Sequence, residues 1–233
     1  MQDTIWNAKR KDAAATDFAE LRRWMVDEQL REHGISDERV LDAMRRVPRE
    51  EFVPEELRDA AYEDGPLPIG FGQTISQPFT VAFMCQALQL EGTEKVLEIG
   101  AGSGYGAAVL SLLASSVFTV ERVPGLVNSA RARLTRTGYE NVNVVAGDGT
   151  LGLPDEAPFD AIVVTAGAET LPDAYVRQLR AGGRIVIPLG RSRHSQTMYR
   201  FTRIDEQLQV ENLGGFAFVP LIGRYGWHER DVE

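Results

Sequence analysis

The chain has 233 residues, of which 43% are hydrophobic and 25% charged, and its formal net charge is −9. This length suits one α/β domain with a modest extension, and the composition is that of an ordinary globular protein, not of a disordered or fibrous chain. Because the negative charge repels polyanions, nucleic acid is not an expected partner.

The N-terminal part predicts a tail followed by two helices. Residues 1–16 mix charged and small residues without a period, as in a poorly ordered tail, and lack the apolar core of a signal peptide. Apolar residues at helical spacing predict a helix over 18–31. Ser36 is then the expected N-cap of a second helix, which Pro48 ends.

Residues 49–77 are expected to form a long, shaped loop, since six prolines and glycines interrupt them. A loop this long inside a compact domain is usually functional or disordered, and its embedded apolar residues favour function. Its end, Gly72–Pro78, leads into a helix for which Ser76 is a good N-cap. The same helix start offers a hydroxyl and N–H groups suited to a carboxylate, so an anion site is compatible with the capping role.

Cys85, in the helix that begins at Pro78, is the only cysteine, which excludes an internal disulfide. Its apolar neighbours predict a buried side chain and not a nucleophile. No apolar stretch has the length of a membrane span. We therefore expect a cytoplasmic protein without membrane contact.

From Lys95 onward, short β-rich runs alternate with helical stretches, which predicts a parallel sheet with helices on both faces. The expected elements are strands at 96–99, 117–121, 142–146, 161–165 and 184–188, and helices from about Tyr105, Gly125 and Leu171. Two alternating segments, 196–204 and 208–219, predict a terminal antiparallel hairpin. The sequence thus indicates an α/β fold with a doubly wound, mostly parallel sheet in residues 79–233, preceded by an N-terminal helical extension and covering loop in residues 17–78.

A glycine-rich turn follows the first strand of this sheet. Gly100, Gly102 and Gly104 let the backbone turn tightly and approach a ligand beside the start of a helix. The spacing lacks the last glycine of GxGxxG, and Glu98 precedes it, where a carboxylate would repel a diphosphate but attract a cationic amino group. These details favour S-adenosyl-L-methionine (SAM) over a nicotinamide dinucleotide. A purely structural turn would have the same letters, so the loop alone decides little.

Acidic residues end the next two strands. Glu121 lies about twenty residues past the glycines, where an acid can accept hydrogen bonds from both ribose hydroxyls. Asp148, followed by Gly149, offers a further acceptor at the same edge of the sheet, for an adenine amino group. A solvated strand-end charge and an Asx turn are the alternatives. Three acids at three successive strand ends, beside the glycine turn, together indicate a nucleotide-type site.

Metal and hydrolase chemistry have no support in the sequence. The three histidines are scattered without an HExxH pattern, and there is no CxxC. No GxSxG elbow is present either. We therefore expect no metal cofactor.

Three stretches resemble the protein-L-isoaspartate O-methyltransferase family: Arg46–Pro54, Gly72–Pro78 and Phe218–Gly223. The resemblance runs from about Leu21 to Trp227, nearly the whole chain. It implies a Rossmann-like SAM methyltransferase fold. The implied activity is methyl esterification of the α-carboxylate of L-isoaspartyl residues in damaged proteins, for protein repair, with S-adenosylhomocysteine as the second product.

Site residues follow from the resemblance by position. The implied SAM contacts are Thr74, Ser76, Glu98, Gly100, Gly102, Ser103, Glu121, Asp148 and Gly149. Ser76 matches the family's active-site serine, which would orient the substrate carboxylate. The implied substrate contacts are Ile75, Ser76 and Val219, with Val219 in the terminal strand beside the substrate peptide. Family members often carry Arg where this chain has Ala217, which leaves its grip on the substrate open. The partners expected are isoaspartyl proteins and peptides, met by a monomer.

Four other functions stay open at this point. A related enzyme could methylate an ordinary aspartate in a dedicated peptide, and a small-molecule SAM methyltransferase could share the cofactor site. A nicotinamide oxidoreductase is disfavoured by Glu98 and by the glycine spacing. A non-catalytic binding protein would keep the cofactor site without methyl transfer.

Overall fold

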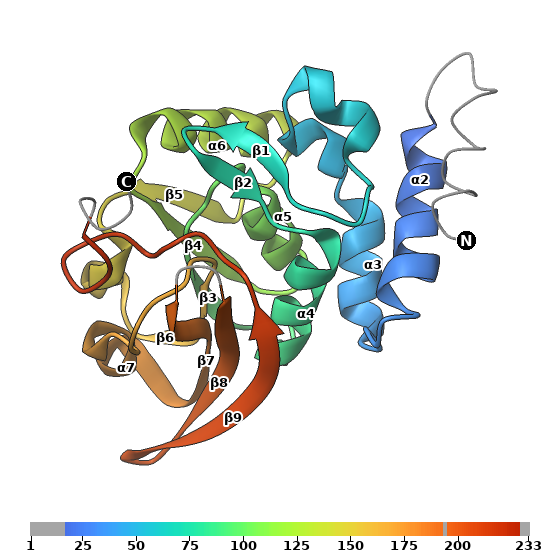
Figure 1. Cartoon of the computed structure of the whole chain (residues 1–233). Helices are drawn as coiled ribbons and strands as arrows, with labels where there is room; N and C mark the ends of the chain where they lie inside the picture. The colour runs from blue at the N-terminus through green and yellow to red at the C-terminus, as the bar shows by residue number, and fades with distance from the viewer. Residues whose placement is uncertain (1–16, 193–194, 229–233) are drawn as a thin grey trace.

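The computed structural model of the chain describes residues 17–192 and 195–228. The predicted tail, residues 1–16, lies outside the described residues. A seven-stranded sheet runs through the molecule in the order β5-β4-β3-β6-β7-β8-β9 (Figure 1). The strands are β3 Lys95–Ile99, β4 Ser116–Glu121, β5 Val142–Ala146, β6 Phe159–Val164, β7 Leu179–Ser192, β8 Ser195–Ile204 and β9 Gln207–Phe216.

The first five of these strands are parallel, and β8 and β9 continue the sheet as an antiparallel hairpin. From β3 the chain moves outward to β4 and β5, then crosses back to β6 on the other side of β3. Such a reversal opens a crevice at the carboxyl ends of the strands, where ligands of doubly wound sheets bind. The predicted fold class is confirmed.

Both faces of the sheet are covered, as the sequence predicts. The helices are α4 Pro78–Leu88, α5 Tyr105–Ser111, α6 Pro124–Thr137 and α7 Asp173–Gln178. One hydrophobic cluster joins α4, α5 and α6 to the face of the sheet that carries Val96, and the other joins α7 to the face that carries Leu97. Because β3 is buried on both faces, its sequence is a continuous apolar run with one interruption, Glu98. Cys85 in α4 is buried, as expected.

The N-terminal helices pack beside α4 (Figure 1). The predicted helix over 18–31 is α2, Phe18–Trp24, which continues as a π-helical segment, Met25–Leu30. The next helix is α3, Glu38–Arg46, and its N-cap is Asp37, which accepts hydrogen bonds from the N–H groups of Arg39 and Val40. The prediction that Ser36 caps this helix is therefore wrong. The helix begins one residue later than expected, and a cap must stand next to the first turn.

Residues 49–77 contain more regular structure than the predicted loop. They form two 3-10 turns, Arg49–Phe52 and Glu55–Ala60, and an antiparallel hairpin of β1, Leu67–Gly70, and β2, Gln73–Ile75. Two strands this short, with prolines and glycines in and around them, carry too few alternating residues to be recognised as strands.

The terminal strand ends earlier than predicted. β9 stops at Phe216, and the N–H of Phe218 donates to the side-chain oxygen of Gln196 at 2.9 Å. The expectation that Val219 lies in this strand is therefore wrong. The Val219 carbonyl instead accepts a hydrogen bond from the N–H of Gly167 at 2.8 Å, which brings the last segment of the chain across the carboxyl edge of the sheet.

Candidate active site

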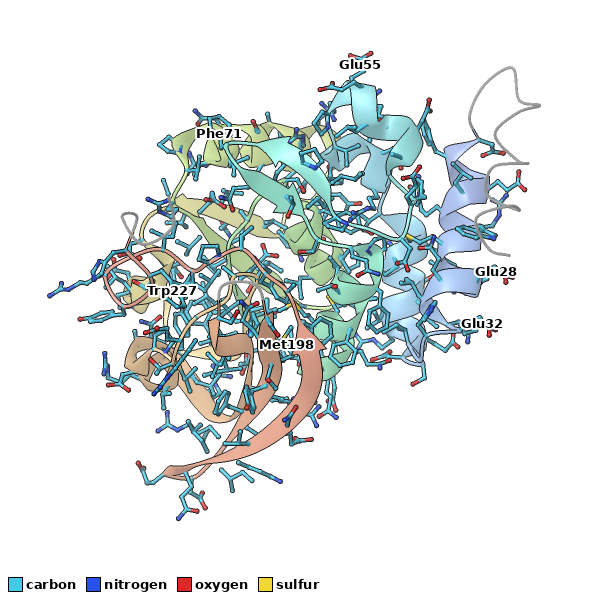
Figure 2. All side chains as sticks on the ribbon, viewed as in Figure 1. Glu28, Glu32, Glu55, Phe71, Met198 and Trp227 are labelled. Atoms are coloured by element: carbon cyan, nitrogen blue, oxygen red, sulfur yellow. The ribbon has the colours of Figure 1, made fainter. Side chains whose placement is uncertain are left out.

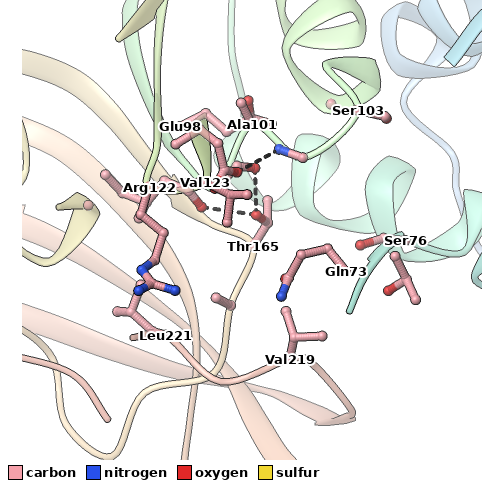
Figure 3. Close-up of a pocket in the computed structure, with 18 of the residues that line it drawn as sticks. Gln73, Ser76, Glu98, Ala101, Ser103, Arg122, Val123, Thr165, Val219 and Leu221 are labelled. Carbon is pink, nitrogen blue, oxygen red and sulfur yellow. Dashed lines mark hydrogen bonds between the residues drawn. The ribbon is translucent and has the colours of Figure 1, made fainter. Parts of the chain in front are cut away.

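A pocket lies at the carboxyl ends of β3, β4 and β6, at the reversal of strand order. Three parts of the chain line it: the β1–β2 hairpin, the strand ends of the sheet, and the segment after β9. Figure 3 shows Gln73 and Ser76 from the hairpin region, Glu98 and Thr165 from the sheet, and Val219 from the last segment around this space. The sequence singled out eleven cofactor and substrate residues, and all of them except Asp148 line this pocket: Thr74, Ile75, Ser76, Glu98, Gly100, Gly102, Ser103, Glu121, Gly149 and Val219.

The glycine turn forms the floor of the pocket. Gly100 and Gly102 have φ values of 99° and 52°, in the left-handed region that favours glycine. A Cβ on Gly100 would stand 2.4 Å from the hydroxyl of Thr165, so any other residue here would clash. Ser103 is buried, and its hydroxyl accepts a hydrogen bond from the N–H of Tyr105 at 3.3 Å. The turn therefore exposes backbone, and not side chains, to a ligand.

Glu121 holds this turn from the end of the next strand. Its two carboxylate oxygens accept hydrogen bonds from the N–H of Gly102 at 3.0 Å and from the N–H of Val123 at 2.9 Å. Each oxygen has a second lone pair, so the carboxylate can still accept hydrogen bonds from a diol in the pocket. Glu121 is 7% exposed, which limits its solvation by water.

Glu98 is a buried acid at the bottom of the pocket. Its side chain is 2% exposed, and one carboxylate oxygen accepts a hydrogen bond from the Thr119 hydroxyl at 2.6 Å. The pKa of Glu98 is raised to about 8: burial is the largest cause, the Thr119 hydrogen bond acts against it, and the nearby charge of Glu121 adds to the rise. A cationic ligand group placed beside Glu98 would favour its ionised form.

Asp148 lies behind the lining of the pocket, and both of its carboxylate oxygens already accept hydrogen bonds from other parts of the chain. One of its oxygens accepts hydrogen bonds from the N–H and the hydroxyl of Thr150, at 2.9 and 2.7 Å, and the other from the N–H of Arg224 at 2.8 Å. The Asx-type turn weighed in the sequence is thus present, and it also ties the last segment of the chain to the sheet. The neighbouring Gly149 does line the pocket.

Ser76 connects β2 to α4, but it does not cap the helix. The N-cap residue of α4 is Gln77, without a side-chain capping bond, so the capping role predicted for Ser76 is wrong. Pro78 occupies the first helical turn and has no N–H to cap, which reduces the need for a capping oxygen. No hydrogen bond of the Ser76 hydroxyl is found within residues 17–192 and 195–228, and the side chain lines the pocket.

A second pocket adjoins the first. Residues Thr74, Ser76, Thr165, Val219 and Pro220 line both. The rest of its lining is apolar or uncharged, and comes from the residue before β1, from the start of α4 and from residues 215–218: Pro66, Gln77, Phe79, Thr80, Gly215, Phe216, Ala217 and Phe218. The two pockets therefore meet at Ser76.

Some lining residues were not singled out from the sequence. Thr165 follows β6, and its hydroxyl lies 2.9 Å from the carbonyls of Ile99 and Gly100. The same strand-end rule that identified Glu121 could have found it, because β6 was an expected strand. Gln73, Arg122 and Leu221 also line the pocket; Gln73 and Leu221 fall within stretches that carry the family resemblance, and no signal in the sequence marks Arg122.

Arg49 was also missed. It is fully buried, and its guanidinium donates to the carbonyl of Ser76 at 2.8 Å and to that of Ala61 at 2.7 Å. Arginine is rarely buried without a carboxylate partner, so sequence reasoning expects it at the surface.

The described residues contain neither a candidate metal site nor a candidate membrane-spanning helix. In residues 17–192 and 195–228, no three His, Cys, Asp or Glu side chains gather in a group that could hold a metal ion. Within the same part of the chain, no helix has the length and apolar character needed to cross a membrane.

The chain is similar to known proteins of one family in both sequence and structure. A model of the protein-L-isoaspartate(D-aspartate) O-methyltransferase family matches residues 22–226. Protein-L-isoaspartate O-methyltransferase 2 of Marinobacter nauticus is 55% identical over 212 residues, which are 91% of this chain and 97% of the relative. A solved protein-L-isoaspartate O-methyltransferase superposes with a TM-score of 0.78 at 32% identity, over 89% of this chain and 67% of the other.

A second solved structure, from Plasmodium falciparum, is described as a putative protein-L-isoaspartate O-methyltransferase in complex with S-adenosyl-L-homocysteine. It has a TM-score of 0.74 and 26% identity, over 86% of this chain and 98% of the other. Since the family model spans most of the chain and the relatives are similar along almost their whole length, the chain belongs to the protein-L-isoaspartate(D-aspartate) O-methyltransferase family.

Proposed function

We propose that this chain transfers a methyl group from SAM to the α-carboxylate of L-isoaspartyl residues in damaged proteins and peptides. One observation carries the proposal beyond family membership. Thr74 and Ser76 line both pockets, and Ser76 has no capping duty in α4. A substrate group in the uncharged pocket would therefore meet a nucleotide in the glycine-turn pocket beside the Ser76 hydroxyl.

The chemistry of the first pocket suits SAM. The buried Glu98 offers a carboxyl to an ammonium group, Glu121 offers oxygens to ribose hydroxyls, and the glycine turn accommodates close contact. We propose that these residues, with Gly100, Ser103 and Gly149, hold the cofactor. Bound there, SAM supplies the methyl group as a sulfonium, so transfer leaves S-adenosylhomocysteine and the α-methyl ester.

The chain needs to position the α-carboxylate of the substrate, but it does not need to deprotonate it. An α-carboxylate is ionised at neutral pH, so no general base is required. Ser76 would donate a hydrogen bond to one carboxylate oxygen and so aim the other at the methyl carbon. Holding reactants in such an arrangement is a large part of catalysis of group transfer.

The second pocket supports a peptide as the substrate. Its aromatic and small side chains, with no charged residue among those that line it, place little restriction on the flanking sequence. Ile75 and Val219 remain proposed substrate contacts, although Val219 would contribute from the segment after β9. Asp148 remains a proposed adenine contact only through the lone pairs that its hydrogen bonds leave open.

We also propose a subcellular location, an oligomeric state and a division of the chain into two parts. These are a monomer in the cytoplasm that acts on isoaspartyl proteins without nucleic acid or membrane partners, and a division into a covering part, residues 17–78, and a SAM-binding domain, residues 79–233.

A substrate comparison tests the proposed activity. Labelled SAM is offered with two peptides that are identical except for isoaspartate or aspartate at one position, and base-labile methanol is measured. We expect label on the isoaspartyl peptide only. Label on aspartate alone would instead identify an enzyme for ordinary aspartate, and label on neither would overturn the proposal.

Replacing Ser76 tests its role. Ser76→Ala should lower kcat/KM for the isoaspartyl peptide roughly 100-fold, because an orienting hydrogen bond at the reacting group is lost, while SAM affinity changes less than about threefold. Ser129→Ala is the matched control, since the Ser129 hydroxyl donates to the Gly125 carbonyl within α6. A collapse of SAM affinity with full turnover, seen by isothermal titration and kinetics, would contradict the assignment.

A further inference from the structure

The environment of Arg49 is unusual for a charged side chain. Its side chain is 0% exposed, and the guanidinium lies over the ring of Tyr105, 4.9 Å from the centroid. Two of its three nitrogens donate to the carbonyls of Ala61 and Ser76, and the third, Nη1, is buried without a hydrogen-bond partner. No carboxylate of the described residues forms an ion pair with it: the adjacent Glu50 binds Arg22 and Tyr62 instead.

A buried charge without a counter-ion destabilises the folded state, and an unsatisfied donor adds to this. Burial lowers the pKa of Arg49, but a guanidinium starts from so high a pKa that it stays protonated at neutral pH. If bridging two carbonyls were the only task, a neutral amide could perform it without burying a charge. The positive charge therefore has a separate use.

The position of the charge indicates that use. Arg49 donates to the Ser76 carbonyl, and the N–H of the same peptide unit belongs to Gln77. Because a trans peptide is planar, this N–H points away from Arg49, and Gln77 lines the second pocket. A positive charge behind the carbonyl polarises the peptide, so that the N–H becomes a stronger donor.

The proposed substrate is an anion, and the chain offers it little other attraction. The net charge is −9, the first pocket is lined by Glu98 and Glu121 with a single cation, Arg122, and no charged side chain lines the second. We infer that Arg49 is a positioning residue that acts through the Ser76–Gln77 peptide, and that its buried charge makes the second pocket selective for a carboxylate over a neutral group. This inference rests on the proposed function, since it assumes that the substrate carboxylate binds beside Ser76.

Two peptide probes show whether the second pocket recognises the charge of the α-carboxylate or only its shape. One is an isoaspartyl peptide with its free α-carboxylate, and the other is the same peptide with an α-carboxamide. Their dissociation constants are measured by calorimetry on the full chain with S-adenosylhomocysteine present. We expect the wild type to bind the carboxylate at least 10-fold more tightly than the carboxamide.

Three substitutions at Arg49 then test whether the preference for the carboxylate depends on the positive charge. Arg49→Lys keeps it and should retain the preference within about threefold. Arg49→Met and Arg49→Gln remove it and should reduce the preference below about threefold, with carboxamide binding and SAM affinity little changed. Gln retains hydrogen-bond donors for the two carbonyls, so it also serves if the Met variant does not fold by circular dichroism. Arg22→Gln is the control, because Arg22 pairs with Glu50 and does not contact Ser76.

The outcomes are distinct. If Arg49→Gln or Arg49→Met keeps the wild-type preference, or weakens the binding of both peptides equally, Arg49 only shapes the loop and the inference is wrong. A wild type that binds both peptides equally also overturns it, even if isoaspartyl peptides are methylated. A wild type that prefers the carboxylate but transfers no methyl group would overturn the proposed function and leave the role of Arg49 standing.

Discussion

Glu98 interrupts an otherwise apolar strand, and its burial makes its charge conditional on what the pocket holds. Its pKa is raised from 4.5 to about 8 by burial, with the charge of Glu121 adding to the shift. The folded chain thus retains a proton that the unfolded chain has released between these two values. Since the native state binds more protons there, its stability must fall as the pH rises through this window.

This gives a pH prediction for the ligand-free protein. From about pH 5.5 to 8, the free energy of unfolding of the wild type should fall relative to that of Glu98→Gln, by at most about 1.4 kcal/mol per pH unit, and the difference should level off above about pH 8.5. Thermal and urea unfolding at several pH values measure it. Glu140→Gln, at an exposed position, is the control for the substitution itself. A difference that grows with pH in favour of the wild type would refute the expectation.

The strand-end rule located two of its three acids at the pocket, whereas the third, Asp148, lies behind the lining. Glu98 and Glu121 lie where a parallel sheet must bring them together, whatever the rest of the chain does. Ser36, Ser76 and Val219 were assigned wrong local structures because a cap and a strand end depend on a one-residue choice of boundary. Arg49 could not be found, since its burial results from packing between segments that no local pattern describes.

The β1–β2 hairpin is the element that covers the glycine turn. Ile69 faces Gly102, where an added Cβ would stand 3.4 Å from its Cδ1. At the hairpin tip, Phe71 has a φ of 55° and is 64% exposed, yet its ring lies against Gly125 at the start of α6. Figure 2 shows Phe71 at this tip, where it overlaps α6 in the view. A left-handed Phe is strained by roughly 1 kcal/mol or more, so the ring contact offsets a conformational penalty.

Removing this ring should loosen the cover more than the fold. We expect Phe71→Ala to raise the dissociation rate of SAM about fivefold, for the loss of about 1 kcal/mol of apolar contact, with little change in melting temperature. Gly125→Ala should act in the same direction, since its Cβ would lie 2.2 Å from the Phe71 ring. Stopped-flow measurements compare both with Ile204→Ala, an exposed apolar residue at the β8–β9 tip. An unchanged rate in both variants would mean that the ring does not hold the hairpin.

The same element shows the limit of pattern reading. The parallel strands other than β7 were predicted within two residues of their ends, because buried parallel strands are continuous apolar runs between helices, whereas β7 extends five and four residues beyond the predicted 184–188. β1 and β2 have only four and three residues, and their pairing depends on a turn at Gly70–Gly72 and on packing over the glycine turn. Their role is set by tertiary contacts, which a local window does not contain.

At the scale of the whole molecule, the site is assembled from three distant segments. The covering hairpin contributes Thr74 to Ser76, the sheet contributes the floor from Glu98 to Thr165, and the segment after β9 contributes Val219 to Ile222. In Figure 1 the hairpin and this last segment approach the same edge of the sheet. The last segment is fixed by Gly167, and further along by Asp148, through hydrogen bonds to Val219, Leu221 and Arg224. A ligand in the pocket must therefore contact three parts of the chain that are far apart in the sequence.

SAM should consequently stabilise all three segments together. At a concentration 100 times its dissociation constant, SAM adds about 2.7 kcal/mol to the free energy of unfolding. We expect hydrogen–deuterium exchange to slow in peptides covering 67–77, 98–106 and 219–227, because each loses local openings once it contacts the ligand. The β8–β9 tip, 203–209, lies outside both pockets and should exchange as before. NADH at the same concentration should protect none of them. Protection confined to 98–106 would show that the hairpin and the last segment do not close on the cofactor, and that the site is built by the sheet alone.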